Sequence, residues 1–152
     1  MKILRHLADE RATLALGARL APLLRPGLKI YLCGELGCGK TTLVRGLLQA
    51  LGYHGKVKSP TYLLVELYTV SRLDLYHFDF YRFKDAEEWQ DAGFREPFNG
   101  QAVCLVEWPE KAASRLPLPD IKINLQITGS GRDVTLEGIT ETGRQCLSLQ
   151  NW

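Results

Sequence analysis

The 152-residue sequence has no large excess of charge of either sign, since 19 lysines and arginines are balanced by 17 aspartates and glutamates, giving a net charge of +2. This balance gives no electrostatic reason to expect strong nucleic-acid binding by the chain alone. The sequence also has no apolar run of membrane-spanning length and no signal peptide. We therefore expect a cytoplasmic protein without a membrane partner.

Cysteine is scarce and shows no pattern typical of a disulfide framework or a zinc site. The four cysteines, at positions 33, 38, 104 and 146, form no C-x-x-C pair and no cysteine–histidine spacing. We interpret them as reduced thiols. There is also no internal repeat or low-complexity linker, so the length predicts a single domain over residues 1–152.

Three of the 14 glycines lie close together in one informative stretch. Residues 34–41 match G-x-x-x-x-G-K-[ST], the phosphate-binding loop, between an apolar segment over 28–32 and helical spacing over 41–51. In such a loop, backbone N–H groups and the helix N-terminus hold a phosphate. Lys40 can reach the outer phosphates, and the Thr41 hydroxyl can bind Mg²⁺. The motif therefore predicts that the chain binds nucleotide phosphates.

Two later segments contain candidate sensors of the nucleotide. Thr61 lies in a Ser-Pro-Thr-Tyr stretch before a strand expected over 63–68, and it fits either a switch loop or an ordinary turn. A hairpin turn near residues 70–72 leads into alternation over 73–83, which places His77 and Asp79 on one strand face. Because aspartate is disfavoured in strands, Asp79 indicates either a Mg²⁺ or water site or a structural pair with His77.

An acidic residue follows the segment that most clearly predicts a buried strand. Residues 102–106 are continuously apolar, as in a parallel strand covered on both faces, and Glu107 comes next. An acid at the carboxyl end of such a strand can bind Mg²⁺ or polarise the attacking water. The neighbouring Trp108 either lines the nucleotide pocket or belongs to the core.

The two ends of the chain complete the expected fold. Residues 7–24 predict a helix capped by Asp9, and residues 84–93 predict a short acidic helix. Arg132 lies at an expected turn, where it is either solvated or directed at a phosphate. The C-terminal part predicts antiparallel hairpins, with strands over residues 121–128, 134–139 and 146–149.

Four motifs together resemble the bacterial TsaE family, also called YjeE, the small ATPases of tRNA threonylcarbamoyladenosine biosynthesis. The first motif alone is shared by many NTPases, but the four in this order in so short a chain are specific. The family's first helix is also matched by Glu10, Thr13 and Gly17. Cys38, where the family usually has a smaller residue, and Phe80, where leucine is common, are conservative departures. The four motifs are Gly34–Leu43, Val57–Tyr62, His77–Arg82 and Leu105–Glu110.

The resemblance implies an α/β fold of the P-loop NTPase type, with a mainly parallel sheet flanked by helices and added antiparallel C-terminal strands. It also implies Mg²⁺-dependent ATP hydrolysis that is slow alone and supports partner subunits TsaB and TsaD. That complex modifies adenosine 37 of tRNAs reading codons that begin with A, so contact with tRNA would be indirect.

The candidate functional residues come mainly from these motifs, with Glu10 added from the matched first helix and Arg132 from the expected turn. Lys40, Glu107 and Asp79 are the candidate catalytic residues, and Thr41 and Glu107 are the candidate Mg²⁺ ligands. The candidate ATP- and ADP-binding residues are Glu10, Glu35, Leu36, Gly37, Cys38, Gly39, Lys40, Thr41, Thr42, Thr61, Trp108, Glu110 and Arg132.

A small-molecule kinase is the alternative function, because P-loop kinases share the same loop. Such enzymes usually carry an arginine-rich lid and an acceptor pocket. Here the segment after Glu107 is rich in proline and contains only Lys111 and Arg115 as early basic residues. We therefore favour an ATPase whose output acts on a partner.

Overall fold

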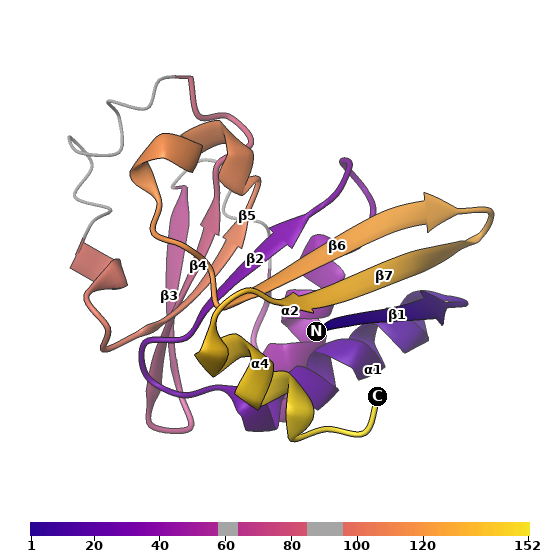
Figure 1. Cartoon of the computed structure of the whole chain (residues 1–152), viewed down its shortest axis with the longest axis horizontal. Helices are drawn as coiled ribbons and strands as arrows, with labels where there is room; N and C mark the ends of the chain where they lie inside the picture. The colour runs from indigo at the N-terminus through magenta and orange to yellow at the C-terminus, as the bar shows by residue number, and fades with distance from the viewer. Residues whose placement is uncertain (58–63, 85–95) are drawn as a thin grey trace.

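The computed structural model describes residues 1–57, 64–84 and 96–152. Its centre is a seven-stranded sheet with the order β1-β7-β6-β2-β5-β4-β3 (Figure 1). The strands are β1 (Lys2–Leu7), β2 (Lys29–Cys33), β3 (Val65–Val70), β4 (Leu73–Asp79), β5 (Val103–Glu107), β6 (Ile121–Thr128) and β7 (Gly131–Gly138).

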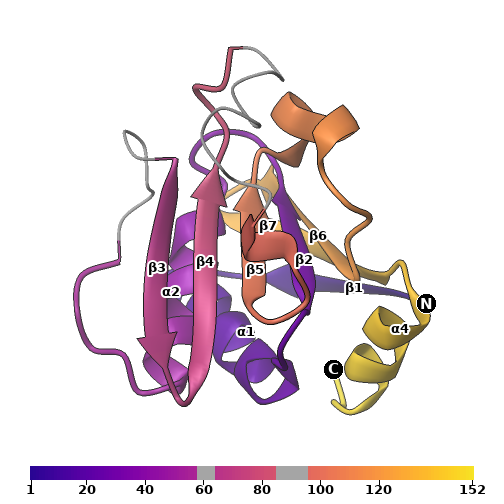
Figure 2. The same cartoon turned by 90° about the vertical axis from the view of Figure 1, so that its left-hand side faces the viewer.

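The middle of the sheet is parallel and both of its ends are antiparallel. Strand β2 pairs in parallel with β5 and β6, and β4 pairs in parallel with β5. The antiparallel pairs are β1–β7, β6–β7 and β3–β4, and Figure 2 shows the β3–β4 hairpin at its edge of the sheet. This arrangement confirms the predicted α/β class, the parallel centre and the antiparallel pairing of the C-terminal strands β6 and β7.

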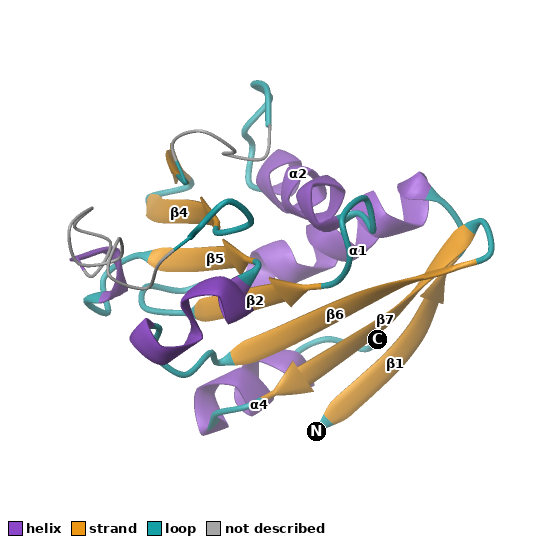
Figure 3. Cartoon of the chain, turned by 90° about the horizontal axis from the view of Figure 1, so that it is seen from above, coloured by secondary structure: helices purple, strands orange, loops and turns teal. Residues whose placement is uncertain are grey.

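Helices flank the sheet. The α-helices α1 and α2 pack on one face, and α4 contributes Cys146 and Leu147 to the same buried cluster (Figure 3). Asp9 caps α1 as predicted, because its Oδ1 accepts a hydrogen bond of 2.9 Å from the Ala12 N–H. The helices are α1 (Glu10–Leu20), α2 (Lys40–Ala50) and α4 (Glu141–Ser148), with 3₁₀ turns η1 (Ala21–Leu23), η2 (Glu96–Phe98) and η3 (Pro109–Arg115). Among the described helices, none combines the length and the apolar character that crossing a bilayer requires.

Helices α1 and α2 approach each other closely through two glycines. A Cβ at Gly17 would lie 2.1 Å from the Leu43 carbonyl oxygen, and a Cβ at Gly46 would lie 2.1 Å from the Leu14 carbonyl oxygen. Larger residues therefore do not fit at either position without moving backbone. The close crossing holds the helix that begins at the glycine-rich loop against α1.

The core differs in character between the two faces of the sheet. On the side of α1 and α2 it is mainly aliphatic, with Leu32 and Leu47 fully buried. On the other side it is aromatic, and the Phe78 and Phe98 rings stack with centroids 5.2 Å apart. Every residue of β5 is buried, as the continuous apolar run predicted. The sheet is thus a rigid support for the segments that follow β2 and β5.

The two ends of the chain differ from the sequence prediction. The expected helix over 7–24 is shorter, and β1 precedes it as an edge strand paired with β7. Within β1, Ile3 and Leu7 pack on the core but Leu4 is exposed, so local alternation is weak and long-range pairing decides the structure.

At the C-terminus, the expected strand over 146–149 is wrong, because α4 forms there. Thr140 caps this helix by accepting a hydrogen bond of 3.1 Å from the Gly143 N–H. The helix buries Cys146 and Leu147 against the rest of the molecule. With only two such apolar residues, the segment was too short to separate a helix from a strand by periodicity alone.

The strands β3 and β4 are close to prediction, with shifted ends. Their turn is formed by Ser71 and Arg72, both with positive φ, as in the two-residue turns of tight hairpins. Strand β4 ends at Asp79 rather than at Phe83, because the Asp79 carboxylate accepts a hydrogen bond of 2.9 Å from the Tyr81 N–H and turns the chain. The helix expected over 84–93 lies almost wholly outside the described residues.

Candidate functional site

The glycine-rich loop connects the end of β2 to the start of α2 at the carboxyl edge of the parallel strands (Figure 1). Gly39 is the N-cap of α2, with φ 106° and no side-chain cap. The N–H groups of the first turn therefore have no partner within the helix. Gly34 lies so close to β6 that a Cβ there would be 2.4 Å from the Leu125 carbonyl oxygen. The loop thus presents an uncapped helix N-terminus, which favours an anion.

Lys40 is a buried cation in this loop. The residue is only 4% exposed, and its Nζ donates a hydrogen bond of 2.5 Å to the Gly34 carbonyl oxygen. The same nitrogen lies 3.8 Å from the centre of the Trp108 ring, a cation–π contact. Within the described residues, no carboxylate forms an ion pair with Lys40. A buried ammonium without a carboxylate partner is suited to binding an anion from outside the chain.

Trp108 is held in this place by an unusual backbone conformation. Its φ and ψ are 56° and 50°, in the left-handed region that non-glycine residues rarely adopt. The residue stands between the end of β5 and Pro109, which begins η3. Its ring contacts Tyr81, with centroids 5.0 Å apart. Of the two alternatives for Trp108, the structure favours a lining residue, although the side chain also packs against the aromatic core.

Glu107 connects the loop helix to the sheet. The residue is 3% exposed, and its Oε2 accepts a hydrogen bond of 3.1 Å from the Thr41 hydroxyl. The same oxygen lies 2.5 Å from the Nε2 of His77. The Thr41 hydroxyl, Glu107 and His77 therefore form one chain of contacts that runs from α2 through β5 to β4.

Asp79 lies beside Glu107 at the ends of neighbouring strands. The two residues are Cα partners in the β4–β5 register, and Asp79 is 6% exposed. One carboxylate oxygen of Asp79 accepts the Tyr81 N–H, so the residue also has a structural role in ending β4. The alternative of a His77–Asp79 hydrogen-bonded pair does not form, since the His77 ring contacts Glu107 through Nε2 and its Nδ1 has no partner among the described residues.

These side chains surround a cavity of about 220 Å³, which we call the loop cavity. Every residue that lines it belongs to the candidate set derived from the sequence. The helix, two strand ends and the loop thus bring together residues that are far apart along the chain. The lining residues are Leu36, Gly37, Gly39, Lys40, Thr41, Thr42, Asp79, Glu107 and Trp108.

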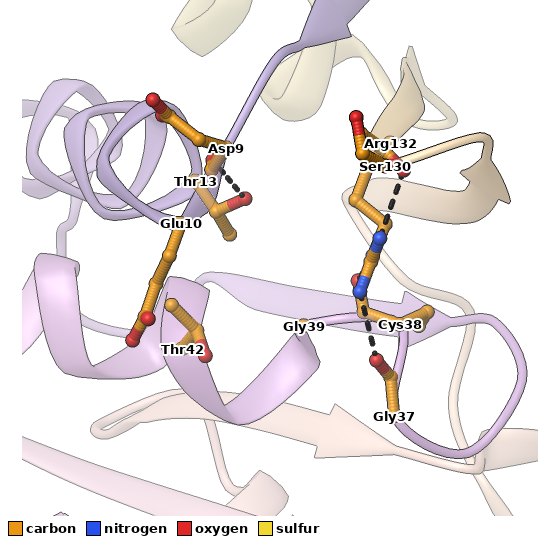
Figure 4. Close-up of a pocket in the computed structure, with 10 residues that line it drawn as sticks. Asp9, Glu10, Thr13, Gly37, Cys38, Gly39, Thr42, Ser130 and Arg132 are labelled. Atoms are coloured by element: carbon orange, nitrogen blue, oxygen red, sulfur yellow. Dashed lines mark hydrogen bonds between the residues drawn. The ribbon is translucent and has the colours of Figure 1, made fainter.

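A second cavity, of about 250 Å³, shares Gly37, Gly39 and Thr42 with the first, and we call it the rim cavity (Figure 4). In Figure 4, Arg132 reaches the loop from one side, and Glu10 comes from α1 on the other. The complete lining is Asp9, Glu10, Thr13, Gly37, Cys38, Gly39, Thr42, Ser130, Gly131 and Arg132.

Arg132 binds the backbone of the glycine-rich loop, whereas the sequence had suggested either a solvated side chain or one directed at a phosphate. It lies on β7 rather than in the turn, and its guanidinium holds the backbone of the loop. The Nε donates to the Cys38 carbonyl oxygen at 2.9 Å, and a terminal nitrogen donates to the Gly37 carbonyl oxygen at 3.2 Å. By fixing these carbonyl groups, Arg132 keeps the shape of the loop.

The remaining candidate residues that the structure describes do not line the loop cavity or the rim cavity. Glu35 is exposed in the loop, and its carbonyl oxygen accepts the Cys38 N–H at 3.2 Å. Glu110 lines a different cavity together with Cys33 and Lys122, apart from the loop and rim cavities. Thr61 lies outside the described residues.

Cys38 in the loop is fully buried, and the four cysteines of the chain are free. Burial raises the pKa of the Cys38 thiol above its ordinary value. The protonated thiol is a poor nucleophile. This environment supports the interpretation of Cys38 as a residue that fills a small-residue position.

Sequence reasoning missed several residues of the site. His77 was noticed for its place on the strand, but not as the partner of Glu107. The additional residues of the rim cavity, Asp9, Thr13, Ser130 and Gly131, were not candidates. Their signals were nevertheless present, since Asp9 precedes Glu10 at a helix start and Ser130 precedes Arg132 in a hairpin.

Comparisons with known proteins agree with this geometry. The family model described as "Threonylcarbamoyl adenosine biosynthesis protein TsaE" matches residues 7–134. A tRNA threonylcarbamoyladenosine biosynthesis protein TsaE of Haemophilus influenzae is 41% identical over 148 residues, covering 94% of each chain. Its counterpart in Bacillus subtilis is 38% identical over 132 residues, covering 86% of this chain and 82% of the relative.

A solved structure supports the same conclusion at the level of the fold. The crystal structure of Bacillus subtilis YdiB superposes with a TM-score of 0.81 and 27% sequence identity, covering 98% of this chain and 93% of that chain. The family match spans most of the sequence, including the loop and the strand that ends at Glu107. The chain therefore belongs to the TsaE family of threonylcarbamoyl adenosine biosynthesis proteins.

Proposed function

We propose that this chain is a Mg²⁺-dependent ATPase that serves the threonylcarbamoylation of tRNA. The observation that carries the ATPase proposal is the convergence of three features in the loop cavity. A buried Lys40 ammonium, an uncapped helix N-terminus and the Thr41–Glu107 hydrogen bond all lie there. Cation, helix end and hydroxyl–carboxylate pair are the parts that phosphoryl transfer from a Mg²⁺-nucleotide requires.

The phosphate groups would be held by the loop. Its uncapped N–H groups and the buried Lys40 ammonium supply positive charge, and the low exposure of Lys40 strengthens its electrostatic interactions. Arg132 supports this task indirectly, because it fixes the Gly37 and Cys38 carbonyl groups. The rim cavity, which shares three residues with the loop cavity, is the space into which the nucleoside would extend.

Thr41 and Glu107 fit a magnesium ion. Both offer the oxygen ligands that Mg²⁺ prefers, and the Thr41 hydroxyl donates its hydrogen to Glu107, which leaves the hydroxyl lone pairs for the metal. When bound, the ion would neutralise charge on the phosphate oxygens. Asp79, next to Glu107 in the register, is placed to orient water at the same edge of the sheet.

Partnership with TsaB and TsaD is what the family resemblance implies, and it does not follow from the geometry. The relatives are named as proteins of tRNA threonylcarbamoyladenosine biosynthesis, and the lining of the loop cavity fits one nucleotide site. We propose that ATP binding and hydrolysis here drive turnover of a complex whose partner transfers the threonylcarbamoyl group to adenosine 37.

Reconstitution with purified TsaB, TsaD, tRNA and the threonylcarbamoyl donor tests this function. With the chain, ATP and Mg²⁺ present, modification is expected to continue over many turnovers, and inorganic phosphate is expected to appear. Replacing ATP by a non-hydrolysable analogue should stop the multiple turnovers. Unchanged modification without the chain would contradict the proposal, and ATP-derived phosphate on a metabolite would instead favour a kinase.

Trp108 provides a direct signal of nucleotide binding. Because its ring contacts the Lys40 ammonium at 3.8 Å, a nucleotide that draws Lys40 to its phosphates should change the tryptophan fluorescence in a saturable way. Trp89 and Trp152 also emit, so Trp108→Phe is the control that must remove the response. A response that survives in this variant would show that Trp108 does not report on the site.

A further inference from the structure

His77 is a buried polar residue that no part of the proposed ATPase mechanism has yet used. It is 0% exposed in the middle of β4, where its Nε2 lies 2.5 Å from Glu107 Oε2. Its other ring nitrogen, Nδ1, is the one fully buried side-chain nitrogen or oxygen without a hydrogen-bond partner among the described residues. Burying an unpartnered polar atom is unfavourable. The only hydrogen bond of the ring among the described residues is the one to Glu107, so this contact is where a role for His77 is to be sought.

The contact concentrates two donors on one oxygen of Glu107. The Thr41 hydroxyl and the His77 ring both bind Oε2. We place the His77 proton on Nε2, because this tautomer leaves only a lone pair, rather than an N–H group, unpartnered at Nδ1. The second oxygen, Oε1, has no hydrogen-bond partner within the described part of the chain. The two donors fix the plane of the carboxylate and keep Oε1 available.

The neighbouring aspartate makes this orientation important. Asp79 and Glu107 are register partners, so two carboxylates stand at adjacent strand ends, where like charges repel. The hydrogen bond from His77 stabilises the Glu107 carboxylate and holds this carboxylate toward the loop cavity, which Glu107 lines. His77 comes two residues before Asp79 on the same strand face, and it approaches Glu107 from within the core.

We propose that His77 is a positioning residue for the metal side of the site, an inference that rests on the proposed ATPase function. It does not touch the nucleotide. Its Nε2–H orients Glu107 so that the carboxylate and the Thr41 hydroxyl present oxygen to one divalent cation. Such partners of a metal ligand typically change metal affinity or activity by about 10- to 100-fold when they are removed.

The test compares His77→Leu, which cannot donate a hydrogen bond, with His77→Gln, whose amide N–H can occupy the place of Nε2. Binding of Mn²⁺ to the chain with ADP is measured by electron paramagnetic resonance, ADP binding without metal is measured by calorimetry, and ATP hydrolysis gives kcat and KM. His77→Leu is expected to weaken Mn²⁺ binding and lower kcat by about 10- to 100-fold. Metal-free ADP binding and KM should remain close to wild type, and His77→Gln should restore most of both losses.

His6→Leu is the matched control, because His6 forms a similar histidine–carboxylate contact with Asp133, at 2.7 Å, on the surface. Wild-type Mn²⁺ affinity and kcat in His77→Leu would overturn the positioning role. Equal losses in His77→Leu and His77→Gln, including metal-free ADP binding, would show that His77 is only structural. Failure of the wild-type chain itself to bind Mn²⁺ with ADP would instead contradict the proposed function.

Discussion

Lys40→Ala is expected to reduce ATP hydrolysis by about 10²- to 10³-fold, the usual loss when one preorganised charge-stabilising donor is removed. The ammonium is buried at the head of α2 and has no carboxylate partner among the described residues. Its removal therefore takes away most of the positive charge available to the outer phosphates. Phosphate release by the isolated chain and tRNA modification by the reconstituted complex are the two measurements.

Two further variants separate charge from packing at this position. Lys40→Met keeps an unbranched side chain against the Trp108 ring and should lose activity as Lys40→Ala does. Lys2→Ala removes an exposed lysine on the distant strand β1 and should leave hydrolysis unchanged. Multiple-turnover tRNA modification at the wild-type rate with Lys40→Ala would refute an ATP-driven role for the loop.

Glu107→Gln is expected to lower hydrolysis by about 10²- to 10³-fold while sparing nucleotide binding. Glutamine keeps the size of the side chain and an oxygen that accepts hydrogen bonds, but it removes the negative charge that attracts the metal. The loop N–H groups and Lys40 are untouched, so ADP affinity measured without metal should not change. Calorimetry with ADP and a phosphate-release assay at increasing Mg²⁺ concentration provide the comparison.

Glu141→Gln serves as the matched control, because Glu141 is an exposed acid at the start of α4 and lines neither the loop cavity nor the rim cavity. It should hydrolyse ATP at the wild-type rate. If Glu107→Gln lost ADP binding in parallel with hydrolysis, Glu107 would be supporting the shape of the loop rather than the metal. Full ATP hydrolysis by Glu107→Gln would show that Glu107 has no role in the reaction.

The parts of the site that could be predicted from the sequence are those encoded by local patterns. The loop is such a pattern, because glycine spacing, Lys40 and Thr41 stand next to one another in the chain. Glu107 was predictable for a different reason, since a fully apolar run placed it at the end of a buried parallel strand. In both cases, the residue type and its immediate neighbours carry the information.

Contacts between distant segments could not be predicted in this way. The bond between His77 and Glu107 depends on the β4–β5 register, and the contact of Arg132 with the loop depends on how the β6–β7 hairpin packs. The same limit applies to β1, whose pairing with a strand more than 120 residues later overrides weak local signals. At the other end, a cap at Thr140 decides the helix α4, although its apolar residues were too few to predict it.

The glycine-mediated crossing of α1 and α2 has a consequence for how a nucleotide could be felt at a distance. At Gly17 and Gly46 the two helices approach each other backbone to backbone, with no room for a side chain at these points, and packed contacts of this kind shift as units rather than deform. We therefore expect a displacement of α2 to be transmitted to α1. Phosphate binding at the loop would then also shift the surface that α1 presents.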